Sequence, residues 1–260
     1  MGSPADVRLS FNEAAETYHR VRPSYPAALF DRLFRLLPAE PEIVEAGPGT
    51  GQATKDLLGR GARVHAVEIG PAMAAVLRAN LPTDRLRVTV GDFELADIAP
   101  GSADAVFSAT AYHWISPAAQ LDRPAALLRP GGVLAVVDLI QVDSPEDAGF
   151  FAAAQPVYER YGQGHTGPPA PSRANVQPEI RRLLDADARF GSIAVHHYDW
   201  NQHYSAAEYR RLMESYSVTQ MMAASDRRGL LADMERFIGD EFGGRVTRPL
   251  VVTLTIATLT

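Results

Sequence analysis

Residues 43–51 read Ile-Val-Glu-Ala-Gly-Pro-Gly-Thr-Gly, an apolar strand end, an acid and three alternating glycines. A strand that turns sharply into a helix beside a ligand needs glycine for unusual backbone angles and for close approach to the bound group. A dinucleotide fingerprint places glycines at its first, third and sixth positions. Here the sixth position is Gln52, and the third glycine comes one residue early, at Gly51. This spacing disfavours a pyrophosphate cradle.

Four further strand-like segments follow, at residues 62–68, 86–93, 104–110 and 133–140. The first of them ends in Glu68, and in Rossmann-type folds an acid at this place accepts hydrogen bonds from ribose hydroxyls. The second ends in Asp92 and Phe93. An acid there can accept from an adenine amino group while the aromatic ring covers the base. The order and spacing of the segments predict an α/β fold with a parallel sheet.

Together these segments resemble the class I S-adenosylmethionine-dependent methyltransferases, in the type 11 subgroup of small-molecule enzymes similar to trans-aconitate methyltransferase. The resemblance implies a Rossmann-like seven-stranded sheet, mostly parallel with an antiparallel last strand, flanked by helices and carrying a helical cap. It also implies S-adenosyl-L-methionine as the cofactor and S-adenosyl-L-homocysteine as its product.

The resemblance implies cofactor-binding residues along the first half of the chain. They are Glu45, Gly47, Gly49, Gly51, Glu68, Met73, Asp92, Phe93 and Ala109. The N-terminal Tyr-x-x-x-Arg-Pro-x-Tyr-Pro pattern of the family matches residues 18–26, which would place Tyr18 and Arg22 near the methionine carboxylate of the cofactor; an arginine fork suits a carboxylate. Each of these assignments has a structural alternative: helix packing for Met73, solvated acids at Glu68 and Asp92, and a surface ion pair or helix cap for Arg22.

The acceptor side is expected in Ala-Thr-Ala-Tyr-His-Trp-Ile at residues 109–115, because ligands in open α/β sheets bind beyond the carboxyl ends of strands. His113 is the general-base or substrate-orienting candidate, since its unperturbed pKa of about 6.5 suits proton acceptance near neutrality. The alternative is that His113 and Trp114 only wall the pocket. The resemblance adds Tyr18 as a second catalytic candidate and Tyr216 as a substrate contact, with helix packing as its alternative. Tyrosines would suit an amphipathic acceptor; those considered are Tyr18, Tyr25, Tyr112, Tyr204 and Tyr216.

The chain is divided into an N-terminal helical arm (residues 1–40), a cofactor-binding core (41–140) and a completion of the sheet with cap insertions (141–260), as one domain overall. Helices are predicted over residues 12–19, 27–37, 147–161 and 177–186. The last two strands are predicted at 192–200 and 246–258, separated by an insertion of two or more helices. A long insertion inside a compact domain is usually a lid or a binding cap.

Composition limits the function classes. The formal net charge of −6 argues against a nucleic-acid partner, and no apolar run is long enough to span a membrane. No cysteine is present, which excludes thiolate chemistry and disulfides. His196 and His197 would face opposite sides of a strand, so no metal site is expected. The beginning of the sequence does not resemble an export signal, and we expect a cytoplasmic protein, a monomer or a homodimer.

The sequence therefore favours methyl transfer to an oxygen, or to an activated carbon or nitrogen, of a small organic molecule. Three alternatives stay open. In the first, an enzyme of the same fold uses only the positive charge of the bound sulfonium, for a pericyclic or decarboxylative step, and transfers no methyl group. A nicotinamide oxidoreductase is disfavoured by the glycine spacing and by the single lysine, Lys55. A non-catalytic binding module is the third.

Overall fold

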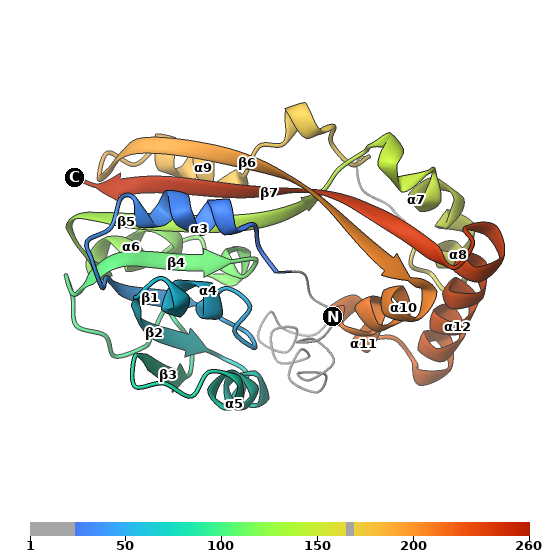
Figure 1. Cartoon of the computed structure of the whole chain (residues 1–260), viewed down its shortest axis with the longest axis horizontal. Coiled ribbons are helices and arrows are strands. Elements are labelled where there is room, and N and C mark those ends of the chain that lie inside the picture. Colours follow the sequence, from blue (N-terminus) through green and yellow to red (C-terminus); the bar gives the residue numbers. More distant parts are fainter. Residues whose placement is uncertain (1–23, 165–168) are drawn as a thin grey trace.

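A seven-stranded sheet forms the centre of the computed structural model, which describes residues 24–164 and 169–260 (Figure 1). The strand order is β3-β2-β1-β4-β5-β7-β6. The strands are β1 Glu42–Ala46, β2 Arg63–Glu68, β3 Leu86–Val90, β4 Ala103–Ala109, β5 Leu128–Gln141, β6 Phe190–Ser205 and β7 Arg245–Leu259. β1 to β5 pair in parallel, and β7 runs antiparallel between β5 and β6. The predicted sheet with its antiparallel last strand is confirmed.

Helices cover both faces of this sheet. They are α3 Ala27–Phe34, α4 Thr54–Gly59, α5 Pro71–Asn80, α6 Ala119–Leu127 and α9 Glu179–Asp185. One face packs against α3, α4 and α5, and the other against α6 and α9. Neighbouring residues of β1 point to opposite faces: Ile43 belongs to the first cluster and Val44 to the second. Strands buried on both faces read as near-continuous apolar runs, which is why the core strands could be located in the sequence.

The antiparallel pair of β6 and β7 extends beyond the core sheet, and a second group of helices packs on its far end (Figure 1). We call this group the helical lobe: α7 Phe150–Ala153, α8 Gln155–Arg160, α10 Ala206–Glu214, α11 Ser217–Gln220 and α12 Ala224–Glu241. Its interior centres on Phe150, whose ring meets the Tyr209 and Phe242 rings edge-on at 5.1 and 5.3 Å. The predicted helical insertion between the last two strands is confirmed.

The prediction of one continuous helix over residues 147–161 is wrong. The segment 147–161 is divided into the 3-10 turn η3 Pro145–Asp147, α7 and α8. Gly149 adopts a left-handed φ of 78° before α7, and Pro156 stands in the first turn of α8. Proline has no N–H to continue a preceding helix but is well suited to begin one. The remaining short elements are η2 Tyr112–Trp114 and η4 Arg173–Asn175.

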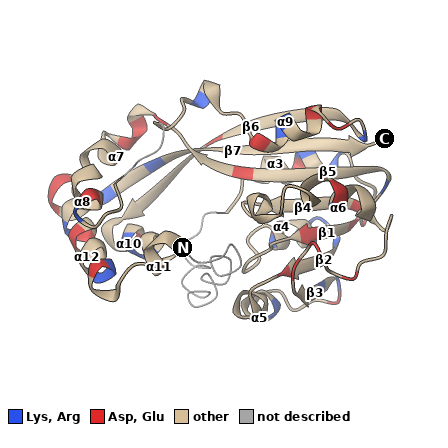
Figure 2. Cartoon of the chain, turned by 180° about the vertical axis from the view of Figure 1, so that it is seen from behind, with Lys and Arg blue, Asp and Glu red and all other residues tan. Residues whose placement is uncertain are grey.

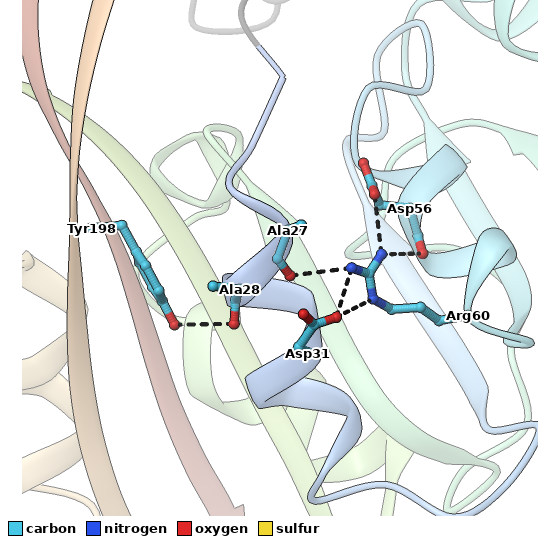
Figure 3. Close-up of polar contacts among 6 residues, drawn as sticks. All are labelled: Ala27, Ala28, Asp31, Asp56, Arg60 and Tyr198. Atoms are coloured by element: carbon cyan, nitrogen blue, oxygen red, sulfur yellow. Dashed lines mark hydrogen bonds and ion pairs between the residues drawn. The ribbon is translucent and has the colours of Figure 1, made fainter.

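Helix α3 is held on the sheet by polar contacts at both sides (Figure 3). Arg60, which follows α4, donates to Asp31 over 2.7 and 3.0 Å and to the Ala27 carbonyl over 3.2 Å. From the other side, Tyr198 of β6 donates to the Ala28 carbonyl over 3.5 Å. These contacts fix the start of α3, and with it the position of Tyr25 just before the helix. The predicted arm helix over residues 12–19 lies outside the described residues.

Acidic and basic residues are interspersed along the surface helices (Figure 2). Arg160 of α8 pairs with Asp233 of α12 at 2.6 Å, and Arg210 of α10 pairs with Glu235 at 2.8 Å. No helix in the described ranges has the length and apolar character needed to cross a membrane.

Candidate functional site

A cavity of about 330 Å³ lies at the carboxyl ends of the central strands. We call it the main cavity. Its lining comes from the loops that follow β1, β2, β3 and β4, from Leu139 on β5 and from Arg248 on β7. This is the edge at which open α/β sheets bind ligands. Among the expected residues, the main cavity is lined by Gly47, Gly49, Glu68, Met73, Asp92, Phe93, His113 and Trp114.

Glu68 holds the first loop and the second together. One of its carboxylate oxygens accepts from the Gly49 N–H over 2.9 Å, and the other accepts from the Gly70 N–H over 2.8 Å. Burial raises the pKa of Glu68, against the lowering effect of these backbone hydrogen bonds. Each carboxylate oxygen has a second lone pair. The Ile69 N–H is a third backbone donor to this carboxylate. Glu68 can therefore accept one more hydrogen bond from a ligand without releasing the loops.

The neighbouring wall combines an acid with apolar surfaces. Met73 and Phe93 are 3% and 6% exposed and line the main cavity from α5 and from the loop after β3. Asp92 accepts from the Glu94 N–H over 3.0 Å and lines the same wall. The arrangement suits a flat apolar ring with a polar edge.

A smaller cavity of about 60 Å³ lies behind the glycine loop and is lined by Tyr25, Glu45, Gln52 and Ala109, among others. Glu45 is 1% exposed and accepts a hydrogen bond from the Thr54 hydroxyl over 2.7 Å. Burial, aided by the charge of Glu68 and opposed by the Thr54 bond, raises the pKa of Glu45 to about 8. The Gln52 side-chain nitrogen is buried, and it has no hydrogen-bond partner among the described residues.

Two glycines of the loop are required for different reasons. A Cβ on Gly47 would lie 2.5 Å from the Ala111 Cβ, so glycine lets the loop after β4 approach the loop after β1. A Cβ on Gly51 would lie 2.6 Å from Cδ1 of Leu77 in α5. Gly51 lines neither cavity, so its place in the fold is explained by helix packing.

Thr110 lies where the cavities meet. It lines the main cavity, the smaller cavity and a third cavity of about 210 Å³. Its φ of 55° is left-handed, which is uncommon for a β-branched residue and is typically retained at functional sites. The Val137 carbonyl accepts from its N–H over 2.8 Å, and its hydroxyl lies 3.1 Å from the Tyr25 hydroxyl. The structure thus places Tyr25 on the smaller cavity.

His113 stands on the wall between the main cavity and the third one, which is also lined by Asp138 and Glu179. Its ring is exposed and lies 5.0 Å from the Trp114 ring, and partial desolvation by the surrounding protein lowers its pKa. Burial, with a further contribution from Glu179, raises the pKa of Asp138 to about 6. A neutral imidazole at this wall can accept a proton from a ligand in either cavity.

Sequence reasoning missed Arg248. It lines the main cavity and donates from Nε to the Gln141 side chain and from Nη1 to the Tyr216 hydroxyl, both over 2.9 Å. The signal was its charge within the predicted strand 246–258, whose other residues are uncharged. Gln52 and Asp138 were likewise not assigned to the site, and Thr110 was included only as part of the segment 109–115.

The other expected residues are distributed differently. Tyr112 and Tyr204 are buried at 3% and 4% exposure, in the sheet core and in the helical lobe. They are therefore not available as polar anchors, and the prediction that used them is corrected. Tyr216 reaches the main cavity only through Arg248. Tyr18 and Arg22 lie outside the described residues. Within the described ranges, no group of three His, Cys, Asp or Glu residues is placed to bind a metal ion.

Comparisons with known proteins find sequence similarity to methyltransferases. The sequence profile of the family described as "Methyltransferase domain" matches residues 44–136. An uncharacterised methyltransferase of Mycobacterium tuberculosis is 43% identical over 136 residues, 52% of this chain and 54% of the relative. A malonyl-[acyl-carrier protein] O-methyltransferase of Dechloromonas aromatica is 33% identical over 139 residues, 53% of this chain and 52% of the relative. The chain thus spans about half the length of these relatives.

Solved structures share the fold over a larger part of the chain. Haemonchus contortus phosphoethanolamine N-methyltransferase 2, solved with phosphomonomethylethanolamine and S-adenosylhomocysteine, aligns with a TM-score of 0.57 at 18% identity, covering 100% of this chain and 60% of that one. The YcgJ protein of Bacillus subtilis aligns with a TM-score of 0.54 at 16% identity, covering 89% of this chain and 97% of that one. Residues 44–136 thus match a methyltransferase domain in sequence, and the chain shares its fold with a solved N-methyltransferase.

Proposed function

We propose that this protein transfers a methyl group from S-adenosylmethionine to an oxygen, or to an activated carbon or nitrogen, of a small organic molecule. The observation that carries the proposal is the main cavity: the loop acids, the apolar ring-sized wall and His113 all line one space at the carboxyl edge of the sheet. The match of residues 44–136 to the methyltransferase profile supports the same function. The relatives named as malonyl-[acyl-carrier protein] O-methyltransferases support oxygen as the acceptor atom.

The residues present fit this cofactor. Gly47 has no room for a side chain, and the buried Gln52 nitrogen and the Glu45 carboxyl offer a donor and an acceptor in the smaller cavity for an amino-acid group. The remaining acceptor position of Glu68 suits a ribose hydroxyl, and Met73 and Phe93 suit the faces of adenine. When bound there, the cofactor supplies an electrophilic methyl group on a positively charged sulfur.

The chain's own contribution to the reaction is positioning and proton transfer. The loop from Thr110 to Trp114 bounds the cavity on the acceptor side, and the left-handed Thr110 fixes how that loop leaves β4. Holding the two reactants in line and excluding water can supply much of the rate enhancement. His113 would accept the proton that an acceptor hydroxyl loses, since its pKa is lowered and the ring is neutral at pH 7.

Calorimetric titration of S-adenosylhomocysteine into the wild type and Glu68→Ala tests the cofactor assignment. We expect binding to the wild type and its loss in the variant, which lacks both loop contacts and the remaining acceptor position. Glu42→Ala, on the neighbouring strand and exposed, is the control that should bind normally. Transfer of isotope from methyl-labelled S-adenosylmethionine to an acceptor panel then tests the reaction. Cofactor binding with an acceptor converted but never labelled would refute methyl transfer.

A further inference from the structure

Arg248 differs from the surface arginines in what surrounds it. Arg160 and Arg210 each pair with a carboxylate at 2.6 to 2.8 Å, and Arg189 pairs with Asp187 at 2.5 Å. Arg248 is half-buried, and among the residues that the structure describes no carboxylate lies within ion-pairing distance of it. A guanidinium removed from water without a counter-charge is costly unless a ligand or a partner supplies one.

The neutral partners of Arg248 leave most of its donors available. A guanidinium has five N–H groups. One at Nε is used by Gln141 and one at Nη1 by Tyr216, and the Tyr216 ring centre lies 6.0 Å from Cζ. Both N–H groups of Nη2 and the second one of Nη1 have no partner within the described part of the chain. Gln141 and Tyr216 therefore orient the fork without neutralising it.

The position of Arg248 in the sheet separates it from the cofactor cradle. Glu68 ends β2 and Asp92 follows β3, whereas Arg248 lies on β7, beyond β1, β4 and β5 in the strand order. His113 and Thr110 follow β4, between the two ends of the main cavity. Among the described residues lining this cavity, Arg248 is the one lysine or arginine, and the acids Glu68 and Asp92 gather at the opposite end.

We propose that Arg248 binds an anionic oxygen group of the methyl acceptor, a carboxylate or a phosphate, with Gln141 and Tyr216 as positioning residues. The inference rests on the proposed function and specifies its substrate class: a small organic anion, placed so that its reacting atom lies at the His113 wall. A guanidinium fork presents two parallel N–H groups to such an anion, which gives orientation as well as affinity. Trp114 on the same cavity suits an aromatic or otherwise apolar body for this molecule.

The test uses pairs of probes that share an aromatic body, one member carrying an anionic group and the other being neutral. Benzoate with benzamide and phenylacetate with phenylacetamide form the carboxylate arm, and phenyl phosphate with phenol forms the phosphate arm. Each probe is titrated, by ligand-observed NMR and calorimetry, into the full chain saturated with S-adenosylhomocysteine. We expect the wild type to bind at least one anion more tightly than its neutral partner, by roughly 10- to 100-fold, the range for hydrogen bonds to a charged group. The arm with the stronger preference identifies the anion.

Three variants make the result specific. Arg248→Met should abolish the preference for the anion while S-adenosylhomocysteine still binds, which also shows that the variant is folded. Arg248→Lys keeps a charge without the fork and should retain part of the preference. Arg245→Met, at the exposed start of the same strand, is the matched control and should behave as the wild type.

The outcomes separate this inference from the proposed function. If S-adenosylhomocysteine does not bind the wild type, the proposed function itself fails. If it binds but no anion in either arm binds more tightly than its neutral partner, or Arg248→Met keeps the preference, only the role of Arg248 is overturned.

Discussion

Replacing Glu45 by glutamine should change how the stability of this protein depends on pH. Glu45 is 1% exposed, and its pKa is raised from 4.5 to about 8, chiefly by burial. Between these values the native state holds a proton that the unfolded chain has released. The free energy of unfolding of the wild type therefore falls as pH rises through this window, and becomes level above about pH 8.

The magnitude follows from the proton linkage. One proton of difference between the two states is worth about 1.4 kcal/mol for each pH unit. Glu45→Gln has no such group, while its amide oxygen can still accept from the Thr54 hydroxyl, now 2.7 Å from Oε2 of Glu45. Relative to the wild type, the variant should thus gain about 2 to 3 kcal/mol between pH 6 and pH 8. Other titrating groups, such as Asp138, are common to both proteins and largely cancel.

Urea unfolding at pH 5, 6, 7, 8 and 9 without ligand measures this difference. Glu42→Gln, an exposed acid at the start of the same strand, should leave the pH dependence unchanged. Parallel stability curves for the wild type and Glu45→Gln would refute the reasoning, because they would mean that Glu45 is ionised in the native state. If a cofactor ammonium binds the ionised Glu45, cofactor affinity should also rise toward pH 8, and this rise should be lost in the variant.

Two further predictions concern the glycine loop and the acceptor wall. Gly51→Ala should lower the free energy of unfolding by about 1 to 3 kcal/mol more than Gly61→Ala does. Both glycines have a φ near 95°, but only a Cβ at Gly51 would meet the buried Leu77 side chain. Equal losses in urea unfolding would mean that Leu77 moves aside. The pKa of His113 is lowered from its ordinary value of 6.5. If the reaction needs the neutral imidazole, kcat should fall only below pH 6.5. His113→Asn should remove that acidic limb and cost roughly 100-fold or more in kcat; an unchanged limb would leave His113 as a pocket wall.

The sequence predicted those features that depend on short stretches of chain. The glycine loop, the acids at the ends of β2 and after β3, and the apolar core strands are each contained within about ten residues, where backbone geometry and hydrophobic patterning act directly. Their order along the chain predicted an α/β fold with a parallel sheet, and the family resemblance implied the antiparallel last strand. These features were sufficient to predict the cradle before any residue was placed in space.

Other features depend on contacts between segments that are far apart in the sequence, and only the tertiary structure decided them. Arg248 reaches the cavity because antiparallel pairing brings β7 beside β5, where Gln141 accepts its Nε proton. Tyr112 turns into the core because the Gln120 carbonyl accepts its hydroxyl there, although its neighbour His113 lines the cavity. Which side a residue faces, and which distant group meets it, depends on packing that no local pattern encodes. The sequence therefore predicted the loops and acids that line one end of the main cavity, and the packing of the helical lobe and of β7 against β5 decided which residues line the other end.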